Sequence, residues 1–259
     1  METVLRVDGI SKSFGGLRAV SAVSFTVEER SITSLIGPNG AGKTTIFNMI
    51  SGFLPAETGE IEFRGRPIHA LKPFEIALRG IGRTFQDPRV FPEMTVLNNV
   101  VVGLRQRGER AGWALLRGPR TAAERRAAQR RAEEILATVG LLERAQERAR
   151  DLSFGEQRFL SIARTLVSDP YLILMDEPTV GLDKPALAKL LDLMRRLSQD
   201  PNRALLVIEH NMDVVMTVSR KIVLLVQGGV VATGTPDEIK KNKSMVEAYL
   251  GRPHVAAGQ

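Results

Sequence analysis

The chain has 259 residues and a formal net charge of +7, with 36 lysines and arginines against 29 aspartates and glutamates. It contains no cysteine, which excludes disulfide frameworks, cysteine zinc sites and thiol catalysis. Its histidines show no metal-ligand spacing, because they lie far apart in the sequence (His69, His210, His254). This length suits one large α/β domain, or a core domain with a smaller insert.

The basic charge is compatible with an anionic partner, either nucleic acid or a lipid surface, and equally with a nucleotide-binding protein that has a solvated arginine-rich face. The first residues lack the basic segment and the apolar stretch of a secretory signal, and no apolar run is long enough to span a bilayer. We therefore expect a cytoplasmic protein.

The first segments of the chain have the patterns of strands. Apolar and polar residues alternate over residues 2–7 and 23–28, which predicts two half-buried strands, and the apolar run over residues 32–36 predicts a buried one. Phe14 lies between the first two strands, beside two glycines. It could stack on an adenine base, or it could be an ordinary aromatic residue of the core or the surface.

Residues 37–44 read Gly-Pro-Asn-Gly-Ala-Gly-Lys-Thr and match the pattern G-x-x-x-x-G-K-[ST], between a predicted strand and a predicted helix over residues 45–50. Their glycines permit backbone conformations that a Cβ forbids, so successive amides can converge on phosphate oxygens. Lys43 can then reach the β- and γ-phosphates, and the Thr44 hydroxyl can ligate Mg²⁺. The alternative is a glycine-rich turn that only caps a helix.

Beyond this loop, residues 59–65 predict a strand, residues 73–78 a short helix and residues 80–85 a short strand. Gln86 follows the last of these. It is either a polar residue at a strand end or a side chain that contacts Mg²⁺ or the attacking water.

The composition changes between Arg105 and Arg131, where nine arginines stand against Glu109 and Glu124 alone. Residues 121–124 form a capping box, and an apolar stripe continues to Val139, so we expect an amphipathic helix with a basic face that ends at Gly140. Such a face is either solvated or binds nucleic acid or lipid. The large apolar residues within the segment (Trp113, Leu115, Leu116) could touch a membrane or a membrane partner.

Residues 152–157 read Leu-Ser-Phe-Gly-Glu-Gln and precede a helical run. Ser153 and Glu156 form a capping box, so this is either a well-capped helix or a second anion site built from Ser153, the Gly155 amide and the helix dipole. A further apolar strand over residues 171–175 ends in Asp176 and Glu177, which places both carboxylates at the carboxyl edge of a sheet.

At that edge Asp176 would orient Mg²⁺, and Glu177 would polarise the water that attacks the γ-phosphate. A strand over residues 204–208 brings His210 to the same edge, where it could donate to a phosphate oxygen. A helix over residues 185–197, short strands from Ile222 and Val230 and two short helices after Pro236 complete the pattern. Its α/β alternation favours a mostly parallel sheet covered on both faces.

The ordered set of phosphate loop, Gln86, LSFGEQ, Asp176-Glu177, Asp183 and His210 resembles the ATP-binding subunits of ABC transporters, from residue 4 to about residue 250. The resemblance implies a single ABC ATPase domain of α/β class. It would have a P-loop NTPase (RecA-like) core with a mostly parallel sheet (residues 1–86 and 158–235), an antiparallel β subdomain, an inserted α-helical subdomain (87–157) and a C-terminal helical tail (236–259).

The resemblance also implies ATP and Mg²⁺ as cofactors, with catalytic roles for Glu177, His210 and Gln86. It places Thr44, Gln86 and Asp176 near the metal. The likeness assigns residues 152–157 to the signature motif and residues 181–183 to the D-loop, and Phe14 takes the place of a common tyrosine. The nucleotide contacts that it implies are Gly37, Pro38, Asn39, Gly40, Ala41, Gly42, Lys43, Thr44, Thr45, Ser153, Gly155, Glu156, Asp183 and Phe14.

Within this family, residues 82–86, the arginine-rich insert, residues 208–216 and residues 248–251 resemble the ATPases of branched-chain amino-acid importers. Importers of urea or other small amides share much of the pattern. The likeness implies transmembrane permease subunits, a second ATP-binding subunit that is a copy or a relative of this chain and, indirectly, a substrate-binding protein. It implies a peripheral location on the cytoplasmic face of the membrane and no nucleic acid.

Two other functions remain. The basic charge is compatible with a soluble ABC ATPase that acts on nucleic acid or the ribosome. A P-loop kinase or GTPase would also use residues 37–44, but it would leave the LSFGEQ segment and His210 without a role.

Overall fold

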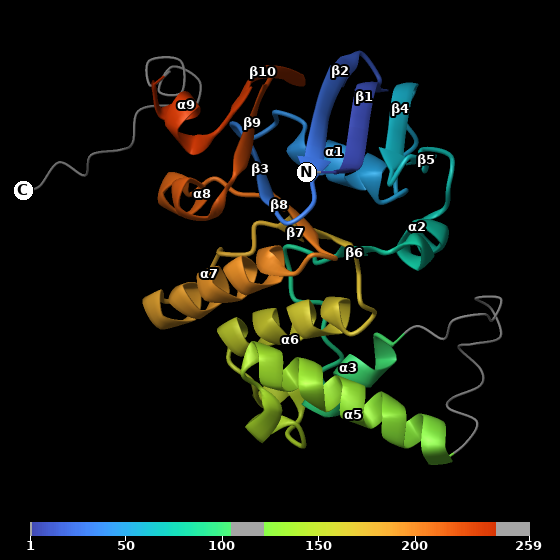
Figure 1. The fold of residues 1–259 in the computed structure, drawn as a ribbon, viewed down its shortest axis with the longest axis vertical. Helices are drawn as coiled ribbons and strands as arrows, with labels where there is room; N and C mark the ends of the chain where they lie inside the picture. Colours follow the sequence, from blue (N-terminus) through green and yellow to red (C-terminus); the bar gives the residue numbers. More distant parts are fainter. Residues whose placement is uncertain (1, 105–121, 242–259) are drawn as a thin grey trace, which may run out of the picture.

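The computed structural model describes residues 2–104 and 122–241, which form two β-sheets with helices packed on and between them (Figure 1). The predicted α/β class with a mostly parallel sheet is confirmed. No helix in the described ranges is both long enough and apolar enough to cross a membrane.

The central sheet has six strands. Their spatial order is β10 (Gly229–Gly234), β9 (Lys221–Val226), β3 (Ile32–Ile36), β8 (Ala204–Ile208), β7 (Leu172–Asp176) and β6 (Ile81–Arg83). All neighbours are parallel except β10 and β9. The register sets both Leu35 and Asp176 opposite Ile208. The ends of β3, β8 and β7 therefore meet at one edge, where the loops that follow them gather.

A second, antiparallel sheet has the order β2 (Leu17–Glu28), β1 (Thr3–Phe14), β4 (Thr58–Phe63) and β5 (Arg66–Pro67). The two predicted N-terminal strands are parts of one long hairpin that reaches Phe14 and Leu17. Register shifts interrupt its ladder near Ile10 and Lys12. They break the period-2 pattern in the sequence, which is why the prediction ended the first strand at residue 7.

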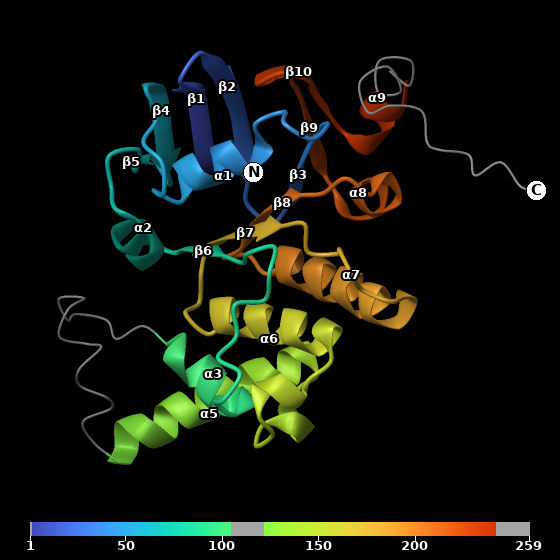
Figure 2. The ribbon, with the colours of Figure 1, turned by 180° about the vertical axis from the view of Figure 1, so that it is seen from behind.

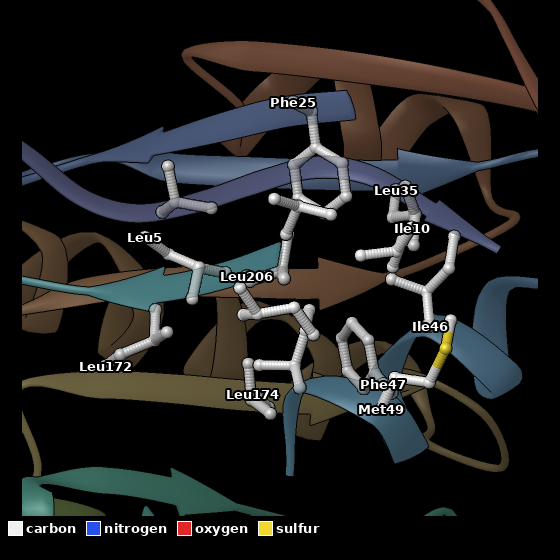
Figure 3. Packing of buried hydrophobic residues seen from close by; sticks show 14 of the residues in the cluster. Leu5, Ile10, Phe25, Leu35, Ile46, Phe47, Met49, Leu172, Leu174 and Leu206 are labelled. Atoms are coloured by element: carbon white, nitrogen blue, oxygen red, sulfur yellow. The ribbon is translucent and has the colours of Figure 1, made fainter. Parts of the chain in front are cut away.

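Helix α1 (Lys43–Ile50) lies between the two sheets. Figure 3 shows Ile46, Phe47 and Met49 of this helix in one cluster with side chains of the antiparallel sheet (Leu5, Ile10, Phe25) and of the central sheet (Leu35, Leu174, Leu206). Burial of each such side chain is worth roughly 1.5–3 kcal/mol. Because α1 is fixed on both sides, the loop at its start is held rigidly over the sheet edge.

On the other face of the central sheet lie α6 (Phe154–Leu166) and α7 (Lys184–Gln199), and α3 (Val96–Val102) and α5 (Ala122–Val139) pack on the far side of α6 (Figure 2). Buried residues of these four helices share a second core with Ile173, Met175 and Leu205 of the sheet. Four residues of the apolar stripe predicted for α5 are buried (Ala132, Ile135, Leu136, Val139), and Ala128 at its start is half-buried. The prediction missed α3. Its sequence is rich in valine and asparagine, and its packing on α5 and α6 overrides that weak helical preference.

Five short helices complete the described chain: α2 (Pro73–Arg79), the 3-10 turns η1 (Leu142–Arg144) and η2 (Ala149–Asp151), α8 (Met212–Val218) and α9 (Pro236–Lys241). The sequence pattern predicted α2 and α9 but not α8, where the Asn211 side chain accepts hydrogen bonds from two backbone amides of the first turn. The second short helix predicted after Pro236 and the Trp113 segment lie outside the described residues.

Candidate active site

The loop over residues 37–42 connects β3 to α1 in a left-handed backbone conformation at three glycines, with φ of 151° at Gly37, 81° at Gly40 and 94° at Gly42. The loop is also closely packed. A Cβ on Gly37 would collide with the carbonyl oxygen of Leu225 in β9, and one on Gly42 would lie 2.5 Å from that of Ala19 in β2. The glycines are thus required by conformation and by contact.

Lys43 begins α1 and is 7% exposed. Its Nζ donates hydrogen bonds to the carbonyl oxygens of Gly37 and Pro38, at 2.8 and 2.9 Å, so the ammonium lies over the loop. Burial lowers the pKa of Lys43, and the smaller opposing effects come from Glu177 and then Asp176. A buried ammonium among carbonyl oxygens suits an anion, whose charge would offset this desolvation.

Two predicted metal-contacting residues lie near the start of α1 and the end of β7. The Thr44 residue is exposed, and Asp176 is 6% exposed. Burial raises the pKa of Asp176, and the nearby Arg83 charge opposes that effect. Among residues 2–104 and 122–241, no three His, Asp or Glu side chains are grouped to hold a metal ion. A hydroxyl and a carboxylate suit Mg²⁺ that also takes phosphate and water oxygens.

Arg83, at the end of β6, was not predicted as a functional residue. Its Nη2 lies 3.3 Å from Asp176 Oδ2, and its Nη1 donates to Asn48 Oδ1 at 2.7 Å and to Ser51 Oγ at 2.8 Å. The guanidinium therefore joins the Asp176 carboxylate to α1. In the sequence, residues 82–86 contributed only to the resemblance to importer ATPases. The signal that could have indicated a role for Arg83 was a positive charge at the end of a buried strand.

The three predicted catalytic residues come together. Gln86 Nε2 donates to Glu177 Oε2 at 2.9 Å, and His210 Nδ1 lies 3.5 Å from Glu177 Oε1. Glu177 has a positive φ of 46°, and its amide donates to the Ile208 carbonyl oxygen at 3.0 Å. The segments that follow β6, β7 and β8 thus meet here, and the Glu177 carboxylate lies between the Gln86 amide and the His210 imidazole.

The predicted second anion site lies apart from residues 37–45. Ser153 caps α6, and Glu156 Oε2 accepts from both the Ser153 amide and the Ser153 hydroxyl at 2.8 Å, which confirms the capping box. Arg144 Nη1 binds the other oxygen of Glu156 at 2.6 Å. Ser153, Gly155 and Asp183 line a hollow of about 430 Å³, and no residue of the phosphate loop belongs to its lining.

Asp183 and Phe14, which were also predicted to contact the nucleotide, interact with neighbouring residues of the chain. Asp183 caps α7 by accepting from the Ala186 amide at 2.9 Å. Phe14 is 47% exposed at the end of the β1–β2 hairpin, and Lys12 Nζ lies 5.8 Å from its ring centroid. The same hairpin contributes Ala19 beside Gly42. Phe14 is therefore an exposed aromatic on the strand pair that borders the phosphate loop.

A second hollow of about 480 Å³ lies among α1, α2, β6, α3 and α6. Phe53, Phe74 and Phe85 provide aromatic walls, and Arg89 and Arg164 contribute charge. Phe53 is 53% exposed and Phe74 is 49% exposed. We call this surface the aromatic groove.

The fold, the phosphate loop, the capped helix α6 and the strand-end carboxylates define an ATP-binding cassette. A family model described as ABC transporter matches residues 20–180. The chain belongs to this family and is one of its ATP-hydrolysing cassettes.

Similar curated proteins match almost from end to end. The high-affinity branched-chain amino acid transport ATP-binding protein LivG of Salmonella typhimurium is 42% identical over 251 residues, which cover 96% of this chain and 98% of that protein. BraF of Pseudomonas aeruginosa, with the same description, is 40% identical over 249 residues, at 96% and 98% coverage.

Similar solved structures cover the fold. A cassette of an ABC transporter in its ADP conformation aligns with a TM-score of 0.85 and 32% identity, over 97% of this chain and 100% of that one. A dimeric cassette in a post-hydrolysis state, bound to ADP and Pi, aligns with a TM-score of 0.75 and 26% identity, over 90% and 98%.

Proposed function

We propose that this cassette powers the import of branched-chain or related amino acids through transmembrane permease subunits, which it binds from the cytoplasmic face of the membrane. The observation that carries the substrate class is the 40–42% identity, over 96% of the chain, to ATP-binding proteins described for branched-chain amino acid transport. A substrate-binding protein would deliver the amino acid to the permease.

For nucleotide binding, the backbone N–H groups of the phosphate loop, which Pro38 lacks, and the Lys43 ammonium hold the phosphates, and Thr44 and Asp176 would supply oxygen ligands for Mg²⁺. Pro38, Asn39, Ala41 and Thr45 complete the loop around the phosphates. Phe14 stacks on the base, which its exposed ring beside the loop supports. A bound Mg²⁺ neutralises charge on the transferring phosphoryl group.

For hydrolysis, Glu177 accepts a proton from the attacking water, and the proton moves to a carboxylate oxygen. Gln86 orients that water and would contact the metal ion. His210 donates a hydrogen bond to the γ-phosphate oxygen. The support for these roles is the contact of Glu177 with both other side chains, at 2.9 and 3.5 Å.

The complete site needs a second cassette. Ser153, Gly155, Glu156 and Asp183 line a hollow to which this chain's own phosphate loop contributes no residue, and we propose that this hollow faces the nucleotide of a partner subunit. A related cassette with 26% identity is dimeric with ADP and Pi. We propose a head-to-tail dimer in which the partner is a copy or a relative of this chain.

Coupling to the permease would occur at the aromatic groove, which lies between α1 and α2 on one side and α3 and α6 on the other. We propose residues 1–86 and 158–235 as the nucleotide-binding core, 87–157 as the helical subdomain and 236–259 as the tail. The packing of α3 and α5 on each other supports a helical subdomain, and the subdomain continues into α6, which crosses the boundary at residue 157.

A mild-detergent pull-down of the tagged chain from its own cell, followed by mass spectrometry, tests this function. We expect two integral membrane proteins and a second ATPase. The assembled transporter should then hydrolyse ATP faster when leucine and the binding protein are added, and urea should have no effect. Recovery of ribosomal proteins or nucleic acid in place of membrane proteins would contradict the transport function and leave the ATPase chemistry intact.

A further inference from the structure

Glu209 is a buried carboxylate at the active edge of the sheet to which the sequence analysis assigned no role. It directly follows β8 and is 1% exposed. Its Oε2 accepts from the Thr179 hydroxyl at 2.5 Å. Its Oε1 accepts from the backbone amides of His210 and Asn211, at 2.9 and 3.0 Å. Both oxygens are thus occupied by donors from two different loops.

These hydrogen bonds connect the two loops that carry the hydrolytic side chains. Thr179 lies two residues after Glu177 on the loop that follows β7, and His210 is on the loop that follows β8. A backbone hydrogen bond from the Glu177 amide to the Ile208 carbonyl oxygen, at 3.0 Å, joins the same loops one step nearer the sheet. Glu209 adds the outer connection, at the level of His210.

The burial of Glu209 constrains the geometry of these hydrogen bonds. A buried carboxylate loses its hydrating water, and this costs free energy unless hydrogen-bond donors take the place of the water. The positions of the carboxylate and of its donors are therefore fixed relative to each other. The His210 side chain is itself 53% exposed. Its backbone is therefore the part that the protein can fix, and Glu209 holds the His210 amide directly.

We propose that Glu209 is a positioning residue for ATP hydrolysis. Through its bonds to the His210 amide and the Thr179 hydroxyl, it sets His210 at the distance from Glu177 at which both meet the γ-phosphate. Glu209 does not touch the reacting atoms. The inference rests on the proposed roles of Glu177 and His210, and it assigns the device that holds the two loops together.

The test uses Thr179→Val, which removes the hydroxyl donor and leaves the two amide bonds of Glu209 in place. A hydrogen bond to a charged group contributes enough that we expect about a tenfold fall in kcat, with the Kd for ATP unchanged. Thr179→Ser keeps the donor and should restore kcat. Hydrogen exchange provides a readout without turnover: the His210 amide should exchange faster in Thr179→Val and not in Thr179→Ser.

Asp200→Asn is the matched control. Asp200 precedes β8 at its other end, and it also accepts from a backbone amide two residues on, at 2.9 Å from Asn202 N. Its change should leave kcat and the His210 amide unaffected. The decisive comparison is made in a His210→Ala background, where Thr179→Val should cause no further loss, because the residue it positions is absent.

An equal loss from Thr179→Val with and without His210 would overturn the positioning role, as would unchanged exchange of the His210 amide. Normal kcat in Thr179→Val, combined with a low kcat in His210→Ala, would reject the positioning role alone. If His210→Ala itself hydrolyses ATP at the normal rate, the proposed role of His210 fails, and the positioning role fails with it.

Discussion

Folding and the metal contact that we propose make opposite demands on the Asp176 carboxylate. Burial raises its pKa above the ordinary value of 3.8, although Arg83 opposes the change. The folded chain therefore binds this proton more tightly than the unfolded chain does. Its free energy of unfolding falls as the pH rises from 3.8 through the raised pKa, and this loss is complete above that pKa.

We therefore expect Asp176→Asn to be more stable than the wild type at pH 7 without nucleotide, and the difference should vanish below pH 3.8. The same variant should lose the part of its ATP affinity that depends on Mg²⁺. Denaturant titrations across pH and nucleotide binding with and without Mg²⁺ measure both effects. A lower stability at pH 7 would contradict the electrostatic account.

We propose Glu177 as the general base, and Glu177→Gln tests that role. The amide keeps the shape of the side chain but cannot accept a proton, so phosphate release should fall at least about 100-fold. ATP affinity should be retained, and gel filtration with ATP should show a stable dimer. Asp192→Asn, which alters an exposed ion pair on α7, is the control and should have normal turnover. Turnover near wild type in Glu177→Gln would contradict the base assignment.

At the scale of elements, α6 is joined to two loops by one side chain. Arg158 is buried, and its guanidinium donates to the carbonyl oxygens of Phe85, Gln86 and Val180 and lies 5.4 Å from the ring centroid of Phe154. The helix that carries the signature motif is therefore connected to the loop of Gln86 and to the loop that leads to Asp183.

Loss of this connection should reduce both stability and turnover. We expect Arg158→Met to lower the free energy of unfolding by about 3 kcal/mol, because three carbonyl groups lose their donor. Arg150→Met removes an exposed ion pair with Glu93 and should cost about 0.5 kcal/mol or less. Chemical denaturation compares the two. Equal losses would mean that Arg158 does not connect the elements.

The sequence predicted those elements and residues that are determined by neighbouring positions in the chain. The glycines at 37, 40 and 42 were recognisable because their positions follow from phosphate chemistry, and their positive φ confirms the conformational reason. Helix α3 was missed because its stability comes from packing on α5 and α6 and not from the helical preference of its own residues. Glu209 and Arg83 were missed because their partners, Thr179 and Asp176, lie 30 and 93 positions away, at distances that only the sheet order brings together.

At the scale of the whole molecule, the proposed head-to-tail dimer gives each chain two half-sites. The phosphate loop, Asp176 and Glu177 form one, while Ser153 and Asp183 line a separate hollow that contains none of them. A symmetric dimer would join each half-site to the opposite half of its partner, so it would contain two equivalent sites. A site composed of two chains leads to a different result in a mixing experiment than a site within a single chain.

Lys43→Ala should abolish ATP binding by the first half-site, and Ser153→Arg should block the second with a bulky cation. Each variant alone should be inactive. Mixed in equal amounts, half of the dimers contain one chain of each kind, and in these one of the two sites is intact. The mixture should therefore regain about a quarter of the wild-type ATPase rate.

The control mixes Lys43→Ala with Glu177→Gln. Both changes damage the same half-site, so every composite site in that mixture carries a defect and no activity should return. Phosphate release measured against mixing ratio distinguishes the cases. A Lys43→Ala and Ser153→Arg mixture that stays inactive, although gel filtration shows that its chains exchange, would place the whole site within one chain and remove the second cassette from the mechanism.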